Sequence, residues 1–178
     1  INKELDTSLD QIPNASLFDI KKRFSDTSNL FPSAFPSEEQ FQSEARLLGL
    51  NNDSAIVVYD DKGIYSSARV WWMFKAFGFT NVAVLNGGFP AWKDSQYPME
   101  SMRPYKGIKG DFIAILQPDY MRFFDDVKQA STNKTHTIID ARSSKRFNCE
   151  VPEPRAGLRM GSIPNSINLP FTDMVFLN

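Results

Sequence analysis

Residues 54–96 alternate between apolar runs of strand length and longer apolar runs of helix length, with turn residues between them. The run SAIVVYD (54–60) is continuously apolar until its last residue, which is typical of a parallel strand buried on both faces. A buried helix is predicted over IYSSARVWWMFKAFG (64–78), a second buried strand over NVAVLNGG (81–88), and a short helix over FPAWKDSQ (89–96). This order, with short connections, predicts an α/β domain built on a parallel sheet.

A further helix is predicted immediately upstream, over PSEEQFQSEARLLGL (36–50). Ser37 and Gln40 have the spacing of a capping box at its start, and a glycine ends it. Phe41 and Ala45 lie four residues apart, so they share one face of the helix, which we expect to pack against the sheet.

The sequence pattern changes at YPMESMRPYKGIKG (97–110). This stretch has two prolines, two glycines and no apolar periodicity. We therefore expect a first domain over residues 1–100, a linker over 101–110 and the first part of a second α/β domain over 111–178. In that second part Asp119 is predicted to cap a helix, YMRFFDDVKQA, and the run HTIIDAR is predicted to form a buried strand.

Two short stretches of the chain resemble each other, QIPNASLFDI (11–20) and SIPNSINLPF (162–171). The strand run HTIIDAR (136–142) precedes the second copy, whereas only ten residues precede the first. The chain is therefore expected to be the middle of a tandem two-domain protein, without the first strand of its first domain and without the end of its second. A complete protein with a chance echo of about ten residues remains the alternative.

Composition and charge argue against several classes of protein. The net charge is −1 and the basic residues are scattered, whereas a nucleic-acid binder usually carries a basic face. No apolar run approaches the roughly 18 residues of a membrane span. A single cysteine excludes an internal disulfide framework, which fits a reducing compartment. The first residue is Ile1, so a targeting segment can be missing, and we expect a cytoplasmic or mitochondrial protein.

The turn after IVVYD is the first candidate site, because ligands of parallel α/β sheets bind at the carboxyl ends of strands. A loop that enters a helix directs backbone N–H groups at an anion, and a cysteine there would be held as a reactive thiolate. The residue at this place is Asp60, followed by Asp61. A carboxylate cannot carry a sulfur atom, so we interpret Asp60 as a structural or capping residue in a loop without catalytic function.

The second candidate is the run of arginines Arg142, Arg146, Arg155 and Arg159. Arg146 and Arg155 flank a loop stiffened by two prolines, and guanidinium groups bind carboxylates bidentately. The loop can present both groups to one anion. The alternative is a solvated loop in which the arginines pair with Glu150 and Glu153.

Cys149 is the third candidate, and the sequence gives it no loop-to-helix cradle. His136, the only histidine, precedes a strand and cannot be placed beside it, so a Cys–His dyad is not expected. Cys149 is interpreted as a passive surface thiol. A metal site needs more cysteines or histidines than this chain has.

The sequence resembles the two-domain rhodanese-like sulfurtransferases, the family of thiosulfate and 3-mercaptopyruvate sulfurtransferases. The stretch IVVYDDKGIYSSARVWWMFKAFGFTNVAVLNGGFPAW (56–92) is similar to the N-terminal domain of that family almost residue for residue. DARSSKRFNCEVPEPR (140–155) and GSIPNSINLPF (161–171) are similar to the start of its C-terminal domain. The resemblance implies tandem rhodanese-like domains, each a parallel sheet flanked by helices, with the second domain partial.

The resemblance also implies roles for residues. Asp60 matches the silent N-terminal position at which the active domain has its cysteine, so the catalytic cysteine is expected downstream of residue 178 and Cys149 is not it. Arg146, in KRF, matches a substrate arginine of the family, and Arg155, in PEPR, matches a second one typical of mercaptopyruvate sulfurtransferases. Together they are expected to bind the carboxylate of the donor.

Several family positions are changed in this chain. Ser162 and Gln11 replace histidines of the two IPN motifs, and the glycines of the GRFxG motif are Lys145 and Cys149. The positions of an Asp and a His found in animal mercaptopyruvate enzymes align with Lys21 or Lys22 and with Ser33. Loss of such acid–base help slows a reaction by about 10²–10⁴-fold without abolishing it.

The resemblance therefore implies a sulfurtransferase that moves a sulfane sulfur from 3-mercaptopyruvate or thiosulfate to a thiol or cyanide-type acceptor through a cysteine persulfide. Its partners are a small anionic donor and that acceptor, with no nucleic acid, no membrane and no metal or organic cofactor. The segment alone is expected to be inactive. The alternative is a catalytically degenerate tandem module that retains the fold and an anion site. Nothing in the residues supports a phosphatase on the same fold.

Overall fold

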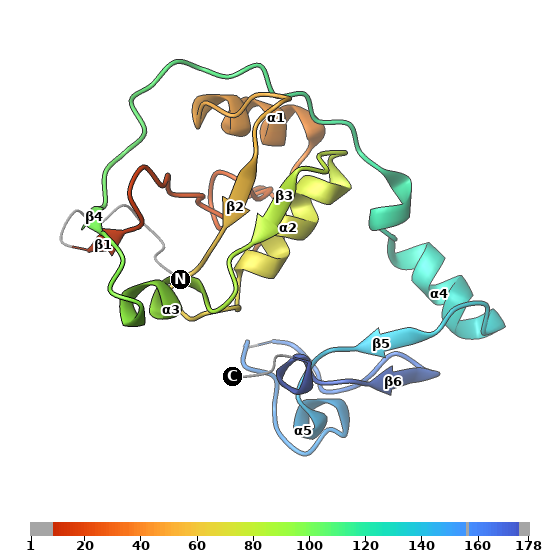
Figure 1. The fold of residues 1–178 in the computed structure, drawn as a ribbon. Helices are drawn as coiled ribbons and strands as arrows, with labels where there is room; N and C mark the ends of the chain where they lie inside the picture. The colour runs from red at the N-terminus through yellow and green to blue at the C-terminus, as the bar shows by residue number, and fades with distance from the viewer. Residues whose placement is uncertain (1–8, 156, 175–178) are drawn as a thin grey trace. The chain divides into compact units, whose positions relative to one another are not determined.

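A computed structural model describes residues 9–155 and 157–174 of the chain. The chain divides after Met121 into two compact units, which we describe separately as unit 1, up to Met121, and unit 2, from Arg122 (Figure 1). Unit 1 contains β1 (Asp10–Gln11), α1 (Glu38–Leu47), β2 (Ile56–Val58), α2 (Ser67–Ala76), β3 (Val82–Val84), α3 (Gly88–Asp94), β4 (Glu100–Ser101) and η1 (Pro118–Tyr120). Unit 2 contains α4 (Phe124–Asn133), β5 (Ile138–Asp140), α5 (Ser144–Phe147), β6 (Ser166–Asn168) and η2 (Phe171–Asp173).

The centre of unit 1 is the parallel pair β2 and β3, in which Ile56 lies opposite Val82, as predicted for this stretch. Ile56 and Val58 pack against an aromatic core, with α2 against the strands. Val57 is 62% exposed. The prediction that this strand is buried on both faces is therefore wrong for the described chain, because no described element covers the face to which Val57 points.

The core of unit 1 is built around Phe41 of α1, which is completely buried. Its ring meets the edge of Phe74 of α2 at 5.2 Å and stacks on Phe77, the residue that follows α2, with centroids 4.3 Å apart. Phe24 and Phe112 complete the shell at 5.3 and 5.8 Å. Aromatic pairs at these separations add to the gain from burial, so a single ring joins the two helices and the two loops.

The start of α1 confirms half of the predicted capping box. The Ser37 hydroxyl accepts a hydrogen bond from the Gln40 N–H at 3.1 Å. The Gln40 side chain does not return to Ser37 but donates to the carbonyls of Arg23 and Ser25. It therefore fixes the loop ahead of the helix instead of the helix end.

Residues 110–117 belong to unit 1 and pack on its core, so the chain divides after Met121 and not at the predicted boundary at residue 111. The Phe112 N–H donates to the Leu50 carbonyl at 3.1 Å, and the Phe112 side chain is part of the core. Further along, the Gln117 N–H donates to the Ala76 carbonyl at 2.7 Å. In the stretch FIAIL (112–116), buried and exposed residues alternate with a period of two. The sequence does not show this period, because all five residues are apolar.

Gly110 tests this packing. Its N–H donates to the Arg46 carbonyl, and an added Cβ would lie 1.9 Å from the Leu50 carbonyl oxygen. We expect Gly110→Ala to lower the free energy of unfolding by about 1–3 kcal/mol, as overpacking does, measured by urea unfolding. Lys109→Ala, at an exposed neighbour, is the control. An unchanged stability of Gly110→Ala would show that this segment does not dock on unit 1.

Unit 2 is organised around the parallel pair β5 and β6, so HTIIDAR does form a strand, but the predicted burial is wrong, because Ile139 is 53% exposed. The predicted cap at Asp119 is wrong, because Asp119 lies in η1 and α4 begins at Phe124. The carboxylate at the start of α4 is that of Asp126, which accepts from the Phe123 N–H at 2.9 Å. Among the described residues, no helix combines the length and apolar character that crossing a lipid bilayer requires.

The sequence echo is confirmed as a pair of matching turns. The Ala15 N–H donates to the Ile12 carbonyl at 3.0 Å, and the Ser166 N–H donates to the Ile163 carbonyl at 3.1 Å. Asn14 and Asn165 have φ of 63° and 61°. Proline followed by a residue with positive φ inside such a hydrogen bond is characteristic of a type II turn. The two units thus share a type II turn as well as a similar sequence.

Candidate functional site

The loop between β2 and α2 surrounds the carboxylate of Asp60. One carboxylate oxygen accepts from the Lys62 N–H at 2.9 Å. The other accepts from the N–H groups of Tyr65, Ser66 and Ser67 at 2.7, 2.8 and 2.9 Å. Asp60 is 8% exposed. Its side chain therefore occupies the place at the helix start where an external anion would bind.

The ionisation of Asp60 follows from these contacts. Burial alone would raise the pKa of the carboxyl group, but hydrogen bonds from the backbone of Ser67, Tyr65 and Lys62 outweigh it and lower the pKa to about 2. The group is therefore a carboxylate at neutral pH, and the loop is satisfied without a ligand. This arrangement favours the structural interpretation of Asp60.

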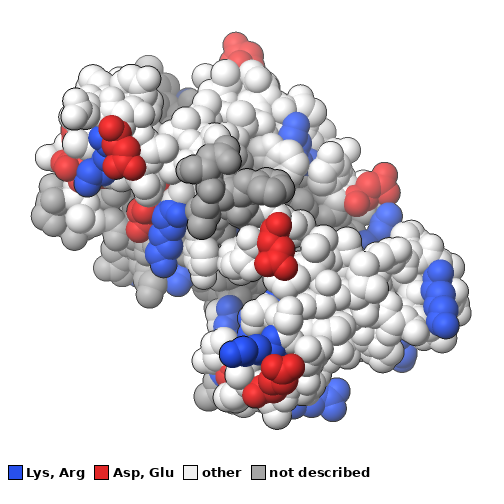
Figure 2. Space-filling view, turned by 60° about the horizontal axis from the view of Figure 1, so that its bottom comes forward, with Lys and Arg blue, Asp and Glu red and all other residues white. Residues whose placement is uncertain are grey.

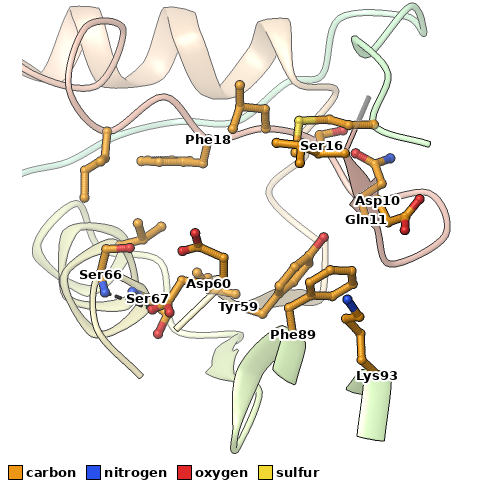
Figure 3. A pocket seen from close by; sticks show the side chains of 17 residues that line it. Asp10, Gln11, Ser16, Phe18, Tyr59, Asp60, Ser66, Ser67, Phe89 and Lys93 are labelled. Carbon is orange, nitrogen blue, oxygen red and sulfur yellow. Dashed lines mark hydrogen bonds between the residues drawn. The ribbon is translucent and has the colours of Figure 1, made fainter. Parts of the chain in front are cut away.

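A cavity of about 430 Å³ opens beside this loop (Figure 3). Ser16 and Phe18 lie on one side of it, and Tyr59 and Asp60 lie on the other. The walls are mostly apolar, and Lys93 stands at the border. The cavity adjoins the carboxyl end of β2, the first candidate position that the sequence offered and one that was interpreted as non-catalytic.

Arg142 and Arg146 of unit 2 meet on one carboxylate, that of Glu153. Arg142 Nη1 donates to Glu153 Oε1 at 2.7 Å, and Arg146 Nη2 donates to Glu153 Oε2. Arg142 also binds both carboxylate oxygens of Asp140 and the Gly161 carbonyl. The pairing of Arg146 with Glu153 is the one that the alternative foresaw, but the Glu153 side chain is only 5% exposed, so the pair lies in a largely buried network and not in a solvated loop.

Charge pairing shifts the ionisation of the network toward its charged forms. A hydrogen bond from Arg146 is the main reason that the pKa of Glu153 is lowered. A hydrogen bond from Arg142 does the same for the pKa of Asp140, and the Asp140 hydrogen bond raises the pKa of Arg142. The sequence did not reveal that Arg142 joins Asp140 to Glu153. The sequence feature that could have indicated this pairing is the presence of acidic residues close to arginines in DAR and PEPR.

The structure does not bring Arg155 into this network. Arg155 is exposed, and its side chain has no ion pair or hydrogen bond with any described residue. Glu150, the other expected partner, accepts instead from the side chain of Asn148 at 3.2 Å. A shared anion site of Arg146 and Arg155 therefore stays a prediction.

Cys149 follows α5 as an exposed thiol with φ of 61°. The ring of His136 is 3.0 Å from the Thr135 hydroxyl, and no described interaction links it to Cys149. Among the described residues, no group of three or more His, Cys, Asp or Glu side chains is arranged to hold a metal ion. On the face shown in Figure 2, lysines and arginines are scattered among acidic side chains.

Among the positions that differ from the family pattern, Gln11 has a local structural role in unit 1. Gln11 is buried and donates to the Ala15 carbonyl and to Glu100, both at 2.9 Å, so it holds the turn that follows it. The Ser33 carbonyl accepts from Arg69 at 2.6 Å. Lys21 and Lys22 are exposed. Ser162, which is the counterpart of Gln11 in the second IPN motif, is exposed.

Comparison with known proteins gives one consistent result. Residues 8–95 match the rhodanese-like domain family. A 3-mercaptopyruvate sulfurtransferase of Escherichia coli is 40% identical over 164 residues, covering 92% of this chain and 58% of the relative. The human 3-mercaptopyruvate sulfurtransferase is 36% identical over 166 residues, covering 92% of this chain and 55% of the relative. The chain thus spans little more than half the length of these curated relatives.

Solved structures agree with the sequence relatives. The crystal structure of SseA from Escherichia coli, described as a 3-mercaptopyruvate sulfotransferase with the rhodanese fold, superposes with a TM-score of 0.84 at 36% identity, covering 94% of this chain and 62% of that one. The Tum1 protein of Saccharomyces cerevisiae superposes with a TM-score of 0.85 at 28% identity, covering 96% and 59%. Both matches extend across unit 1 and unit 2.

Proposed function

Because this chain belongs to the rhodanese-like sulfurtransferases, we propose that the protein of which it is part moves a sulfane sulfur from 3-mercaptopyruvate or thiosulfate to a thiophilic acceptor. The observation that carries the proposal is the similarity to 3-mercaptopyruvate sulfurtransferases, which spans both units. The site geometry adds a guanidinium group, that of Arg146, held by an almost buried carboxylate. Such a group is suited to bind the carboxylate of a small anionic donor.

The proposed chemistry takes place at a cysteine located beyond residue 178. Its thiolate attacks the sulfur of mercaptopyruvate, and the carbon–sulfur bond breaks as the persulfide forms. The electron pair leaves on the enolate of pyruvate, which takes up a proton. A thiol or cyanide-type acceptor then attacks the outer sulfur and releases the cysteine thiolate. Arg146 and Arg155 orient the donor, and Asp60 keeps unit 1 catalytically silent.

The intact mass of the longer protein, before and after exposure to 3-mercaptopyruvate, tests this function. We expect a gain of one sulfur atom that a reductant removes. The segment that ends at Asn178 should show no such gain and no turnover. A longer protein that gains no sulfur would favour the second candidate, a degenerate binding module. The observation that favours this module is that Gln11 and Ser162 stand where the family has histidines.

Arg146 is expected to matter for donor binding. In the longer protein, Arg146→Ala should raise KM for mercaptopyruvate roughly 10- to 100-fold, the range expected for losing a hydrogen bond to a charged group. Arg146→Lys should recover part of the loss, because an ammonium group keeps the charge but not the planar fork. Steady-state kinetics measures both, and Arg159→Ala is the control. Equal KM values for Arg146→Ala and Arg159→Ala would exclude Arg146 from donor binding.

A further inference from the structure

Arg142 and Arg146 differ in how much of their hydrogen-bonding capacity the chain uses. A guanidinium group carries five N–H donors on three nitrogens. All three nitrogens of Arg142 donate, and their acceptors are Asp140, Glu153 and the Gly161 carbonyl. The Arg146 side chain makes one hydrogen bond within the described part of the chain, from Nη2 to Glu153. Arg142 is therefore a structural group, whereas Arg146 keeps donors for a ligand.

Burial separates the two members of the Arg146–Glu153 pair. The Glu153 side chain is 5% exposed, and that of Arg146 is 31% exposed. The carboxylate is thus enclosed, while part of the arginine side chain stays open to solvent. Nε of Arg146 is buried and has no hydrogen-bond partner among the described residues, so the donors that a ligand can reach are on the two Nη atoms.

The enclosed carboxylate is itself held from several directions. Arg142 links Glu153 to Asp140, the last residue of β5. A proline on either side of Glu153 fixes φ of the backbone there. Arg146 lies on α5, which has only four residues and offers little support of its own. Its guanidinium group is therefore tied to the end of a strand through Glu153 and Arg142.

We propose that Glu153 is a positioning residue for the donor site. It does not touch the donor but fixes the Arg146 guanidinium so that its free N–H groups are directed at the donor carboxylate. This inference rests on the proposed function, because it takes Arg146 as the donor-binding residue. The Glu153 charge also offsets that of Arg146, so orientation and charge act in opposite directions on donor affinity. Orientation dominates, because a guanidinium that rotates freely loses rotamer freedom whenever a donor binds.

Replacing Glu153 with glutamine tests the positioning role. The amide has the same shape, but an NH₂ donor replaces one of the two acceptor oxygens. Because Arg142 and Arg146 each use a different oxygen, the amide cannot accept from both. In the longer protein we expect KM for 3-mercaptopyruvate to rise about ten-fold and kcat to change less than about two-fold, at the low end of the effect known for groups that orient metal ligands.

The matched control is Glu150→Gln, the same exchange three residues away in the same loop. Glu150 is exposed and accepts from the Asn148 side chain, outside the network. Its replacement should leave KM unchanged. A lower KM in Glu153→Gln would overturn the proposal, because it would show that Glu153 only weakens the positive charge of Arg146.

A double-mutant cycle distinguishes positioning from general support of the loop. A positioning residue acts through Arg146, so in an Arg146→Ala background Glu153→Gln should change KM by no more than about two-fold. An equal rise of KM in both backgrounds would overturn the proposal. Circular dichroism checks folding. If Glu153→Gln does not fold, Glu153→Asp takes its place in the cycle, because it keeps both oxygens but withdraws them by one methylene.

Binding of pyruvate separates this inference from the proposed function, because pyruvate has a carboxylate and no sulfur to transfer. An NMR titration of the longer protein should show about ten-fold weaker pyruvate binding in Glu153→Gln. Weaker binding in a protein without turnover would refute the function and leave the positioning role standing. Turnover with unchanged KM and pyruvate affinity in Glu153→Gln would do the reverse. A protein that neither turns over nor binds pyruvate would overturn both.

Discussion

Replacing Phe41 with alanine will lower the free energy of unfolding of unit 1 by about 3–5 kcal/mol, the range for removing a fully buried aromatic ring. The ring is the contact point of Phe24, Phe74, Phe77 and Phe112, so its loss leaves a cavity bounded by other rings. These neighbours come from α2, from the residue that follows it and from two loops, which cannot all close on the space. Because whole domains are stable by only about 5–15 kcal/mol, this loss is a large fraction of the total stability.

Urea unfolding followed by tryptophan fluorescence measures this loss. Leu30→Ala is the control, because Leu30 is 95% exposed and its replacement should change the stability by no more than about 0.5 kcal/mol. A loss below about 1 kcal/mol for Phe41→Ala would mean that the ring is not enclosed as described.

Replacing Asp60 with alanine is expected to cost about 3 kcal/mol, because four backbone N–H groups lose a charged acceptor in a nearly closed loop. Asp60→Asn keeps the shape but offers one carbonyl oxygen in place of two carboxylate oxygens, so it should cost less than Asp60→Ala. Urea unfolding near neutral pH should therefore order the stabilities as native chain, then asparagine, then alanine. Asp61→Asn, at the exposed neighbour, is the control.

The contribution of Asp60 should also depend on pH in a defined direction. The folded pKa of about 2 lies below that of an unfolded aspartate, about 3.9, so the folded state favours the ionised form. The stabilisation is complete above about pH 4 and is lost as the pH falls toward about 2. The stability difference between the native chain and Asp60→Asn should therefore shrink over this interval. A difference that stays constant would show that the carboxylate is not held by the N–H groups.

The sequence predicted most of the elements but not how far unit 1 extends. The continuous apolar residues of IVV predicted a strand, and the four-residue spacing of Phe41 and Ala45 predicted a helix. Both patterns are detectable because burial of side chains imposes them on the sequence. Residues 111–117 were assigned to the second domain because prolines and glycines ahead of them resemble a linker. Their docking depends on backbone hydrogen bonds to Leu50 and Ala76, which no local pattern encodes.

The candidate site was predictable in part. Asp60 was located from the position of a turn between strand and helix, and its four hydrogen bonds fit the structural role inferred for it. Arg146 was identified as an anion-binding residue, and pairing of the arginines with Glu150 and Glu153 was weighed only as the alternative. That choice depends on how the loop with two prolines folds back, which is a tertiary matter. Only the structure identifies Glu153 as the shared partner of Arg142 and Arg146.

The division of the chain after Met121 has an optical consequence. All three tryptophans and all five tyrosines lie before it, and unit 2 contains none of either. Near-ultraviolet absorbance, fluorescence and near-ultraviolet circular dichroism of this chain therefore report almost entirely on unit 1. Unfolding of unit 2 will pass unnoticed by these probes, and a transition that looks two-state by fluorescence describes one unit only. A tryptophan introduced at Phe147 would give unit 2 a signal of its own.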